Sequence, residues 1–432
     1  MEPVEPGMRI LSLDVMRGVA VLGILLMNVV SFSLPDPAYW DPSVLGGETG
    51  WNLRFYLFDS LLVEGSMRAI FSMLFGAGVI LFTTRKGVNG SPAETAVLWY
   101  RRTAWLILFG VLHAYLLVFP GEVLFAYGMV GLLLFPVRNS SPSRLLLFSL
   151  LLMGVLATLR ISEYRASERI NSQYEAALEA LATGAPVTRQ KEAGMEVWMR
   201  KLQRAKPDEQ QLEENISNMR SGYLSALVTR APYILYMQTG YFFRVGFLDT
   251  LSMMLLGMAL FRWGIFHARR SPPVYLAMMG AGYGLGLTIN WLETTTYIRS
   301  GFDLLTFFNV NRSYDPGRVL IAMGHIGSTM LFIRWNAFSR LKELLAAVGR
   351  MALTNYLLQS LIGATLFIGF RQYGQWQRYE LCYLVAAIWI FQLIFSYYWL
   401  KNFRFGPVEW LWRRLTYGGK GMQQARHLFQ SS

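Results

Sequence analysis

The sequence predicts an all-α polytopic membrane protein with about ten transmembrane helices. Of its 432 residues, 53% are hydrophobic and only 16% are charged, whereas a soluble protein carries about a quarter charged residues. Apolar runs long enough to cross a bilayer recur from one end of the chain to the other. Helices satisfy their backbone hydrogen bonds internally, so they are the expected spanning elements and the lipid bilayer is the first predicted partner.

The first apolar run, residues 11–32, is long enough to span and is followed by no A-x-A cleavage site, so we expect a retained helix rather than a cleaved signal. The third and fourth runs are short and joined through Pro120 and Gly121, which predicts a hairpin. The predicted spans are 11–32, 55–83, 103–119, 122–137, 144–161, 246–266, 273–295, 317–335, 347–369 and 380–400.

Lys and Arg in the short connections predict the orientation. Thirteen of these Lys and Arg residues, among them Arg85 and Lys86, lie in the connections between spans 2–3, 4–5, 6–7 and 8–9. Six lie in the connections at the other face of the membrane. This asymmetry predicts that both termini are cytoplasmic. Basic residues in the C-terminal tail, including Lys420 and Arg426, agree.

The composition divides the chain into four parts. Residues 1–161 and 241–418 form two membrane halves of five predicted spans each, and residues 419–432 form a cytoplasmic tail. Between the halves, residues 162–240 are rich in Glu, Gln, Arg and Lys with apolar residues at helical intervals, which predicts periplasmic surface helices. A solvated structural insert and a dedicated binding module both fit this pattern.

Charge and cysteine content exclude several classes. The net charge of +13 is explained by basic residues beside spanning segments, so we predict no nucleic-acid partner. The single cysteine, Cys382, excludes an intramolecular disulfide and a cysteine-based zinc site, and no metal is expected. Gly76 to Gly78 and Gly280 to Gly286 are small-residue runs that predict close helix packing.

Ionisable residues inside the predicted spans are the strongest pointers to function, because they are costly in a membrane unless paired or used. Asp14 and Arg17 lie three residues apart, so they share one face of the first helix near its cytoplasmic end. Arg350 lies near the cytoplasmic start of the ninth span. The remaining polar residues lie toward the outer face: Glu64, Arg68, His113, Glu122, Asp249, Asn290, Glu293, Arg318 and His325.

Two interpretations fit these residues. Ion pairs and hydrogen bonds that fix helix packing explain many of them, including Glu64 with Arg68 at i,i+4. Alternatively they line a polar cavity that opens outward, in which His113 acts as a general acid or base, the usual role of histidine near neutral pH, and a carboxylate such as Glu64 or Glu122 orients it. Asp249 is a third candidate for that orienting carboxylate. The substrate cavity would comprise Arg68, Asp249, Glu293, Arg318 and His325.

Several stretches together resemble the YeiB-like family of bacterial inner-membrane proteins. They are Ser12–Asn28, Gly349–Ser360, Phe405–Gly418, and His113–Tyr115 followed by Gly121–Leu124. The family usually has Asp where this chain has Glu122. The resemblance covers nearly the whole chain and implies a multi-pass protein of the bacterial inner membrane.

The first of these stretches is also similar to the opening helix of transmembrane acyltransferases, including heparan-glucosaminide N-acetyltransferases. In membrane O-acyltransferases that modify surface sugars, a histidine lies eleven residues after the arginine. Asn28 occupies that position here, as asparagine does in the glucosaminide enzymes, whose catalytic histidine follows in the next loop. No histidine lies between Asn28 and His113, so His113 would have to act from another helix.

This second resemblance implies a transmembrane acyltransferase. The donor would be a cytoplasmic acetyl-CoA or another acyl-CoA, and the acceptor a periplasmic or membrane-embedded small molecule. The donor would be bound by Asp14, Arg17, Arg350 and Asn355, and catalysis would be carried by His113, Glu64, Glu122 and Asn28.

Two other functions fit the sequence. A transporter or exporter of a small polar solute would explain two groups of five spans and ionisable residues near the midplane. The two halves show no inverted sequence symmetry, which argues against a transporter without excluding one. A membrane scaffold or sensor that meets partners through residues 162–240 is the third hypothesis.

Overall fold

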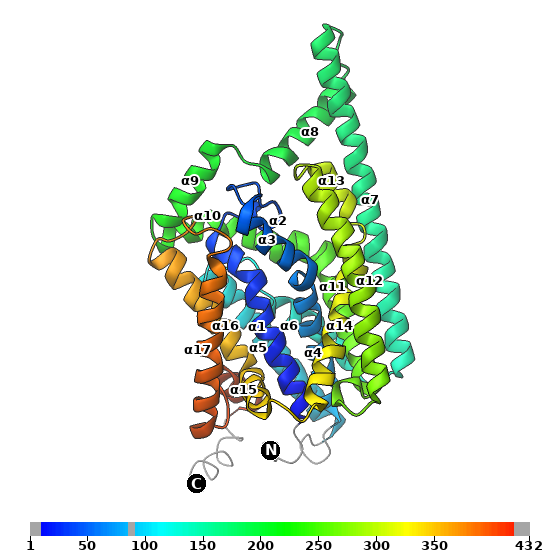
Figure 1. Cartoon of the computed structure of the whole chain (residues 1–432), viewed down its shortest axis with the longest axis vertical. Coiled ribbons are helices and arrows are strands. Elements are labelled where there is room, and N and C mark those ends of the chain that lie inside the picture. The colour runs from blue at the N-terminus through cyan, green and yellow to red at the C-terminus, as the bar shows by residue number, and fades with distance from the viewer. Residues whose placement is uncertain (1–9, 85–90, 419–432) are drawn as a thin grey trace.

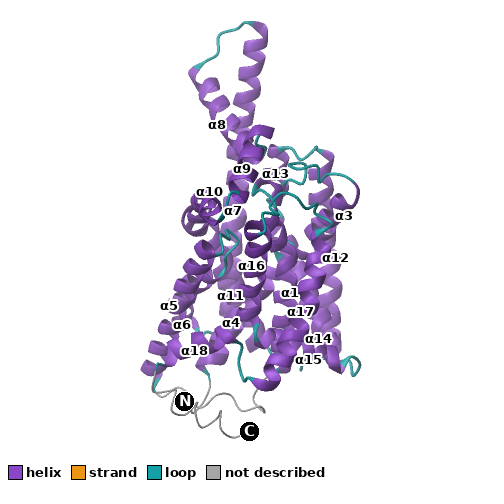
Figure 2. Ribbon diagram, turned by 90° about the vertical axis from the view of Figure 1, so that its left-hand side faces the viewer, coloured by secondary structure: helices purple, strands orange, loops and turns teal. Residues whose placement is uncertain are grey.

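The computed structural model describes residues 10–84 and 91–418 (Figure 1). Within these ranges the chain forms helices and no strand (Figure 2), which confirms the predicted all-α class. The predicted tail 419–432 and the basic residues Arg85 and Lys86 lie outside the described residues.

Each of the ten predicted spans falls on helical segments, although the span 55–83 is interrupted at Glu64 and Gly65 and the span 347–369 at Met351. Among the described residues, seven helical segments are long and apolar enough to cross a membrane: Leu11–Ser33, Gly50–Thr83, Pro142–Thr183, Tyr223–Arg262, Tyr314–Arg334, Ala352–Gly369 and Leu381–Asn402. The other predicted spans correspond to α5 (Pro92–Leu116), α6 (Leu124–Val137) and α12 (Pro272–Arg299). The apolar helices indicate association with a lipid bilayer.

The remaining helices have the following bounds: α1 (Leu11–Ser33), α2 (Pro37–Trp40), α3 (Gly50–Phe58), α4 (Ser66–Thr83), α7 (Pro142–Thr183), α8 (Arg189–Ala205), α9 (Glu209–Arg220), α10 (Tyr223–Tyr236), α11 (Phe247–Arg262), α13 (Leu304–Val310), α14 (Tyr314–Arg334), α15 (Ser339–Arg350), α16 (Ala352–Ala364), α17 (Leu381–Asn402) and α18 (Pro407–Tyr417). Short π-helical or 3₁₀ turns at Asp59–Val63, Met237–Gly246, Ile265–His267 and Thr365–Gly369 connect some of them.

Helices from the two sequence halves interleave. From the first half, α1 packs on α15, α16 and α17, and α4 packs on α11. The first-half helix α7 also packs on α11, whereas α5 pairs with α6 and α12 pairs with α14. The membrane-embedded part is therefore one bundle rather than two separate groups of five.

Glycines permit the closest of these helix crossings. A Cβ atom on Gly349 of α15 would lie 1.8 Å from the backbone oxygen of Asp14 in α1. A Cβ on Gly76 would lie 2.0 Å from the backbone oxygen of Met254, and one on Gly282 would lie 2.5 Å from the backbone nitrogen of Gly324. The predicted role of these glycine runs in close helix packing is confirmed at Gly76 and Gly282.

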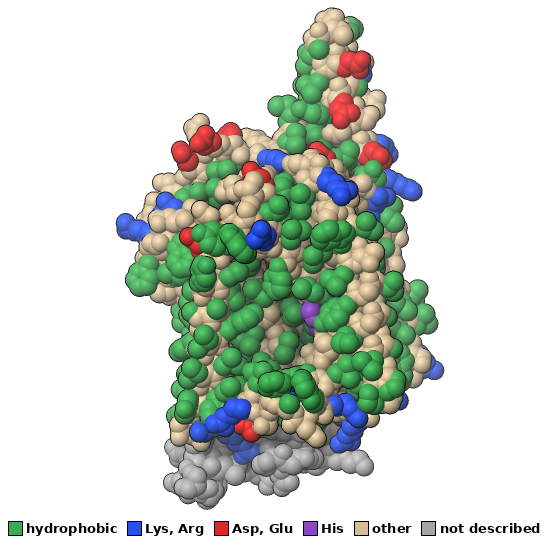
Figure 3. Space-filling view, viewed as in Figure 1, with side chains coloured by type: hydrophobic (Ala, Val, Ile, Leu, Met, Phe, Trp, Pro, Cys, Tyr) green, Lys and Arg blue, Asp and Glu red, His purple; other side chains and the backbone are tan. Residues whose placement is uncertain are grey.

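The two ends of the bundle differ. We call the end where α1 begins and α18 lies the terminal face, and the end that carries α8 and α9 the insert face (Figures 1 and 2). The 42-residue helix α7 continues beyond the bundle at the insert face and packs against α8. Figure 3 shows basic side chains near both ends with hydrophobic side chains between them, as expected of a membrane protein. The predicted orientation places the terminal face in the cytoplasm.

Candidate functional site

A deep cavity of about 280 Å³, here called the inner cavity, lies among α1, α4, α5, α6, α15, α16 and α18. At the terminal face its lining includes Trp412 and Tyr417 of α18. It extends to Leu124, the first residue of α6, which lies about 20 Å along that helix from its end at Val137. The inner cavity therefore penetrates far into the bundle.

Four arginines line the inner cavity, one each from α1, α5, α15 and α18: Arg17, Arg102, Arg350 and Arg413. Arg102 lies over the ring of Trp412, 3.5 Å from its centroid, so it is held by a cation–π contact. Arg17 donates to Asp14 over 3.2 Å, which confirms that these two residues share a face of α1. The lining is strongly cationic, as a site for phosphate groups requires.

Apolar and aromatic side chains form the rest of the wall. They include Phe71, Leu74, Phe75, Leu81, Phe82, Trp99, Leu106, Leu124, Tyr127, Leu353 and Tyr356. The cavity thus combines cationic groups with a largely apolar interior, which suits an elongated ligand with an anionic end and an uncharged end.

Glu409 is the carboxylate among the lining residues, and it caps the start of α16. It accepts hydrogen bonds from the backbone N–H groups of Leu353 (2.7 Å) and Thr354 (3.0 Å), and from the Thr354 hydroxyl. Burial raises the pKa of the Glu409 carboxyl above its ordinary value, although the hydrogen bonds from Thr354 and Leu353 oppose this. This cap fixes α18 beside α16 and so closes the wall of the inner cavity.

His113 lies beside the deep end of the inner cavity. Its Nδ1 is 3.6 Å from Oε1 of Glu122, and both side chains are only 1% exposed. Neither ring nitrogen of His113 has a hydrogen-bond partner. Glu122 itself accepts from the backbone N–H groups of Leu124 and Phe125, which fixes its carboxylate at the start of α6. A buried histidine with uncommitted nitrogens next to a fixed carboxylate has the composition of a general base.

Tyr356 separates His113 from the inner cavity. Its ring lies edge-on to the imidazole of His113 with 5.1 Å between centroids, and it also lines the cavity. Its hydroxyl accepts a hydrogen bond from the backbone N–H of Val123 over 3.3 Å. His113 is therefore next to the cavity but is not part of its lining.

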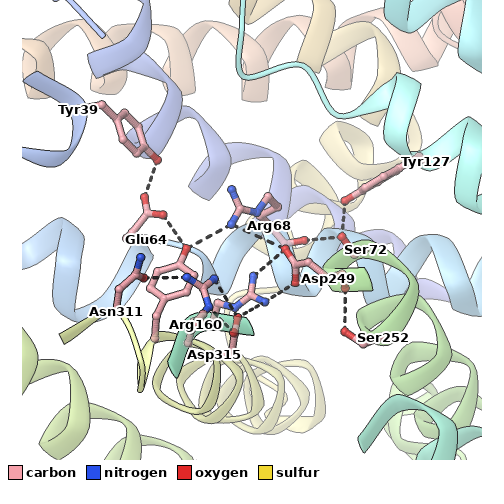
Figure 4. Close-up of polar contacts among 12 residues, drawn as sticks. Tyr39, Glu64, Arg68, Ser72, Tyr127, Arg160, Asp249, Ser252, Asn311 and Asp315 are labelled. Atoms are coloured by element: carbon pink, nitrogen blue, oxygen red, sulfur yellow. Dashed lines mark hydrogen bonds and ion pairs between the residues drawn. The ribbon is translucent and has the colours of Figure 1, made fainter. Parts of the chain in front are cut away.

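A second polar group lies nearer the insert face (Figure 4). Asp249 of α11 pairs with Arg318 of α14 and lies 4.0 Å from Arg68 of α4. Arg318 also pairs with Asp315 over 2.7 Å, and Asp315 pairs with Arg160 of α7 over 2.6 Å. We call these five residues the charge network. It joins four helices and balances three arginines against two carboxylates in the interior of the bundle.

Glu64 and Arg68, predicted to form a direct ion pair, are instead connected through the hydroxyl of Tyr314. The helix is interrupted between them because Gly65 has φ +68°, so the two residues do not lie one turn apart on a continuous helix. Glu64 accepts from the hydroxyls of Tyr39 (2.5 Å) and Tyr314 (2.8 Å), and Arg68 donates to the same Tyr314 hydroxyl over 3.2 Å. The expected i,i+4 ion pair was wrong for this geometric reason.

A cavity of about 90 Å³, the outer cavity, lies beside the charge network. Its polar lining comprises Asp59, Ser60, Glu64, Asn290, Glu293, Thr294, Asn311 and Arg318, and its aromatic lining comprises Tyr39, Trp40, Tyr56, Tyr297, Phe307 and Tyr314. Glu64, which precedes α4, lines the outer cavity. Ser72 of α4 forms a 2.7 Å hydrogen bond with Tyr127, which lines the inner cavity. Arg68 and Ser72 therefore lie between the two cavities.

The remaining predicted site residues lie apart from both cavities. His325 bonds the backbone oxygen of Leu62 (2.7 Å) and the hydroxyl of Tyr283 (2.9 Å), a structural arrangement. Asn355 is fully buried and donates to Val348 and Ser396. Asn28 is partly buried in α1 and lines neither cavity.

The structure also assigns places to residues that the sequence did not single out. Arg160 and Asp315 are 155 residues apart, so nothing in the local pattern predicts their ion pair. Tyr39 and Tyr314 both donate hydrogen bonds to Glu64. Of these residues, Arg160 alone could have been recognised from the sequence, because an arginine at the end of a long apolar run indicates a functional or paired charge.

The stretches that carry the family resemblance meet around the inner cavity. Ser12–Asn28 contributes Arg17, and Gly349–Ser360 contributes Arg350 and Tyr356. The stretch Phe405–Gly418 contributes Glu409, Trp412, Arg413 and Tyr417, and His113 with Glu122 lies behind Tyr356.

Comparison with known proteins agrees with this resemblance. Residues 260–419 match the family model described as "Protein of unknown function (DUF418)". The chain is similar to the "Uncharacterized protein YeiB" of Escherichia coli (strain K12), with 33% identity covering 96% of this chain and 97% of that protein. It is also similar to the "Uncharacterized protein YxaH" of Bacillus subtilis (strain 168), with 28% identity covering 96% of each chain. No solved structure matches the chain significantly. The chain therefore belongs to the YeiB family.

Proposed function

We propose that the protein is a transmembrane acyltransferase of the bacterial inner membrane, with a cytoplasmic acyl-CoA as donor. The observation that carries this proposal is the inner cavity, which combines four arginines with an apolar interior and ends beside the buried pair of His113 and Glu122. An acyl-CoA has the matching composition, with phosphates at one end and an uncharged acyl thioester at the other.

The arginines would bind the donor phosphates. Guanidinium groups make paired, charge-assisted hydrogen bonds to phosphate, each worth about 1.5–3 kcal/mol. Arg17, Arg102 and Arg350 come from three different helices, so they surround a ligand rather than contact one side of it. The wall formed by Phe71, Leu74 and Leu106 would hold the uncharged arm that leads to the thioester, because these side chains offer no competing charge.

His113 would act as the general base. It would accept the proton of the acceptor's N–H or O–H group while the acceptor's nitrogen or oxygen forms a bond to the acyl carbon and the thioester C–S bond breaks. The His113 imidazolium would then give this proton to the released CoA thiolate, which leaves the acylated acceptor, free CoA and neutral His113. Glu122, fixed 3.6 Å from His113, would stabilise the imidazolium that forms in between. Tyr356 would have to turn aside for the reactants to reach His113.

The test is CoA binding and acyl transfer by the purified full-length protein in lipid nanodiscs. We expect saturable binding of acetyl-CoA by calorimetry, weakened at least about tenfold by Arg350→Gln or Arg102→Gln. Arg340→Gln is the matched control, since Arg340 is exposed on α15 outside the inner cavity and contacts Glu343 and Tyr397. Absence of acetyl-CoA binding, together with absence of CoA-dependent transfer to a broad panel of acceptors, would reject the proposal.

Transport of a small polar solute is the second candidate, and one observation favours it. The inner and outer cavities lie on opposite sides of Arg68, whose partners Asp249 and Tyr314 come from other helices. A charged partition between two cavities is an arrangement in which alternate opening would move a solute across. Saturable uptake into proteoliposomes that requires Arg68 and occurs without acyl-CoA would favour transport over acylation.

A further inference from the structure

Acidic side chains outnumber basic ones in the lining of the outer cavity. Its lining contains the carboxylates of Asp59, Glu64 and Glu293 and the guanidinium of Arg318. Arg318 is already paired with Asp249 and Asp315 in the charge network, so it does not neutralise the lining carboxylates.

Two of these carboxylates have an oxygen without a hydrogen-bond donor. Oδ1 of Asp59 and Oε1 of Glu293 are both buried, and neither accepts a hydrogen bond. Arg378 lies near Asp59, and the Ser313 hydroxyl and Arg160 lie near Glu293. A buried carboxylate oxygen without a donor is unfavourable, so a ligand that brings N–H groups would be bound where it satisfies both.

The third carboxylate, that of Glu64, is held in place by tyrosines that belong to an aromatic wall. Tyr39 and Tyr314 both donate to Glu64, and the ring of Tyr39 lies 4.8 Å from that of Trp40. The ring of Trp40 is in turn 5.9 Å from that of Phe307. Aromatic ring faces attract cations, and this attraction strengthens when the cation is removed from water.

We propose that the outer cavity binds a small organic cation that carries a primary ammonium group. Two of its three N–H donors match the two uncommitted oxygens, and its methylene groups match the aromatic wall. Among the described residues no group of three or more His, Cys, Asp or Glu side chains is placed to hold a metal ion. The inference is independent of the acyltransferase proposal, because it requires only this cavity.

The outer cavity has a neighbouring space on the insert face. A cavity of about 680 Å³ shares Trp40, Tyr297 and Phe307 with it, and these aromatic rings form the boundary between the two. Asp41 in the larger cavity pairs with Lys206, which follows α8. A cation would reach the outer cavity from this side once the shared rings move.

Ethanolamine and ethylene glycol provide the test, because they are similar in size and differ in the charge of one group. Both are titrated against the wild-type protein in nanodiscs of zwitterionic lipid, with binding followed by ligand-observed NMR. We expect saturable binding of protonated ethanolamine and at least about tenfold weaker binding of ethylene glycol. Equal binding of the two, or no saturable binding of ethanolamine, would overturn the proposal without the use of any variant.

Variants then locate the site. Glu293→Gln and Asp59→Asn should each weaken ethanolamine binding about tenfold, whereas Glu163→Gln should not, because Glu163 is exposed and pairs with Arg244 outside the cavity. Unchanged ethanolamine binding in both folded cavity variants would overturn the assignment. Acetyl-CoA binding, measured on the same samples, should be the same in all three variants as in wild type, which separates failure of this inference from failure of the proposed function.

Discussion

The inner and outer cavities have opposite electrostatic character although they lie in one helical bundle. The inner cavity is lined by four arginines and a buried, hydrogen-bonded carboxylate, and the outer cavity by three carboxylates and an arginine whose charge is already paired. Between them lies the charge network, in which Arg68 and Arg318 share Asp249. The difference teaches that one helical bundle can hold a basic and an acidic cavity on opposite sides of Arg68, so the two proposals place ligands of opposite charge in them.

Replacing His113 tests the comparison most severely. His113→Gln should reduce acyl transfer about 10²–10⁴-fold, because a general base contributes that much, while acetyl-CoA binding stays within about twofold of wild type. His325→Gln is the matched control, since His325 is bonded to Leu62 and Tyr283 away from both cavities. If the two variants lose transfer equally, His113 has no special role.

Breaking the charge network should produce the largest loss of stability. Asp249→Asn leaves the buried guanidinium of Arg318 with a weaker partner, and removing one member of a buried pair costs about 3–5 kcal/mol. The measurement is the thermal unfolding midpoint, with Glu343→Gln as control because its ion pair with Arg340 is exposed. An unchanged unfolding midpoint in Asp249→Asn would show that the charge network does not stabilise the bundle between the two cavities.

Filling the crossing of α1 and α15 should cost less. Gly349→Ala places a Cβ 1.8 Å from the backbone oxygen of Asp14, so the helices must separate at the wall of the inner cavity, at a cost of about 1–3 kcal/mol. Gly280→Ala is the control, because a Cβ there meets no atom within 4 Å. Unfolding midpoints and acetyl-CoA affinity should both fall in Gly349→Ala alone. Equal behaviour of the two variants would contradict the packing described for α1 and α15.

The smallest predicted effect concerns pH and Glu409. Because burial raises the pKa of its carboxyl above the ordinary value of 4.5, the folded state binds the proton more tightly than the unfolded state. The resulting stability is full below the ordinary pKa and is lost as pH rises through the raised pKa. The free energy of unfolding of wild type relative to that of Glu409→Gln should therefore increase as pH falls from about 7 to about 5. A difference that decreases over this interval would contradict the assignment.

The sequence predicted well what depends on local pattern. The helical class, the pairing of Asp14 with Arg17 and the packing role of Gly76 all follow from spacing along one helix, and the structure confirms them. The ten apolar runs likewise fall on helices, because hydrophobic length is a local property.

The sequence could not predict what depends on distant partners or on local backbone geometry. Glu64 and Arg68 looked like neighbours on a helix, but the positive φ of Gly65 interrupts it and Tyr314, 250 residues away, bridges them. Arg160 and Asp315 meet only because α7 and α14 pack together in the bundle. The sequence offered three carboxylates as partners for His113, and only the folded hairpin of α5 and α6 places Glu122 beside it.

Calorimetric titration of acetyl-CoA into the purified protein tests the central claim most directly. The arginine-lined inner cavity predicts saturable binding that is at least about tenfold weaker in Arg102→Gln and Arg350→Gln and unchanged in Arg340→Gln. Absence of binding in wild type, or equal binding by all three variants, would contradict the assignment of the inner cavity as a donor site.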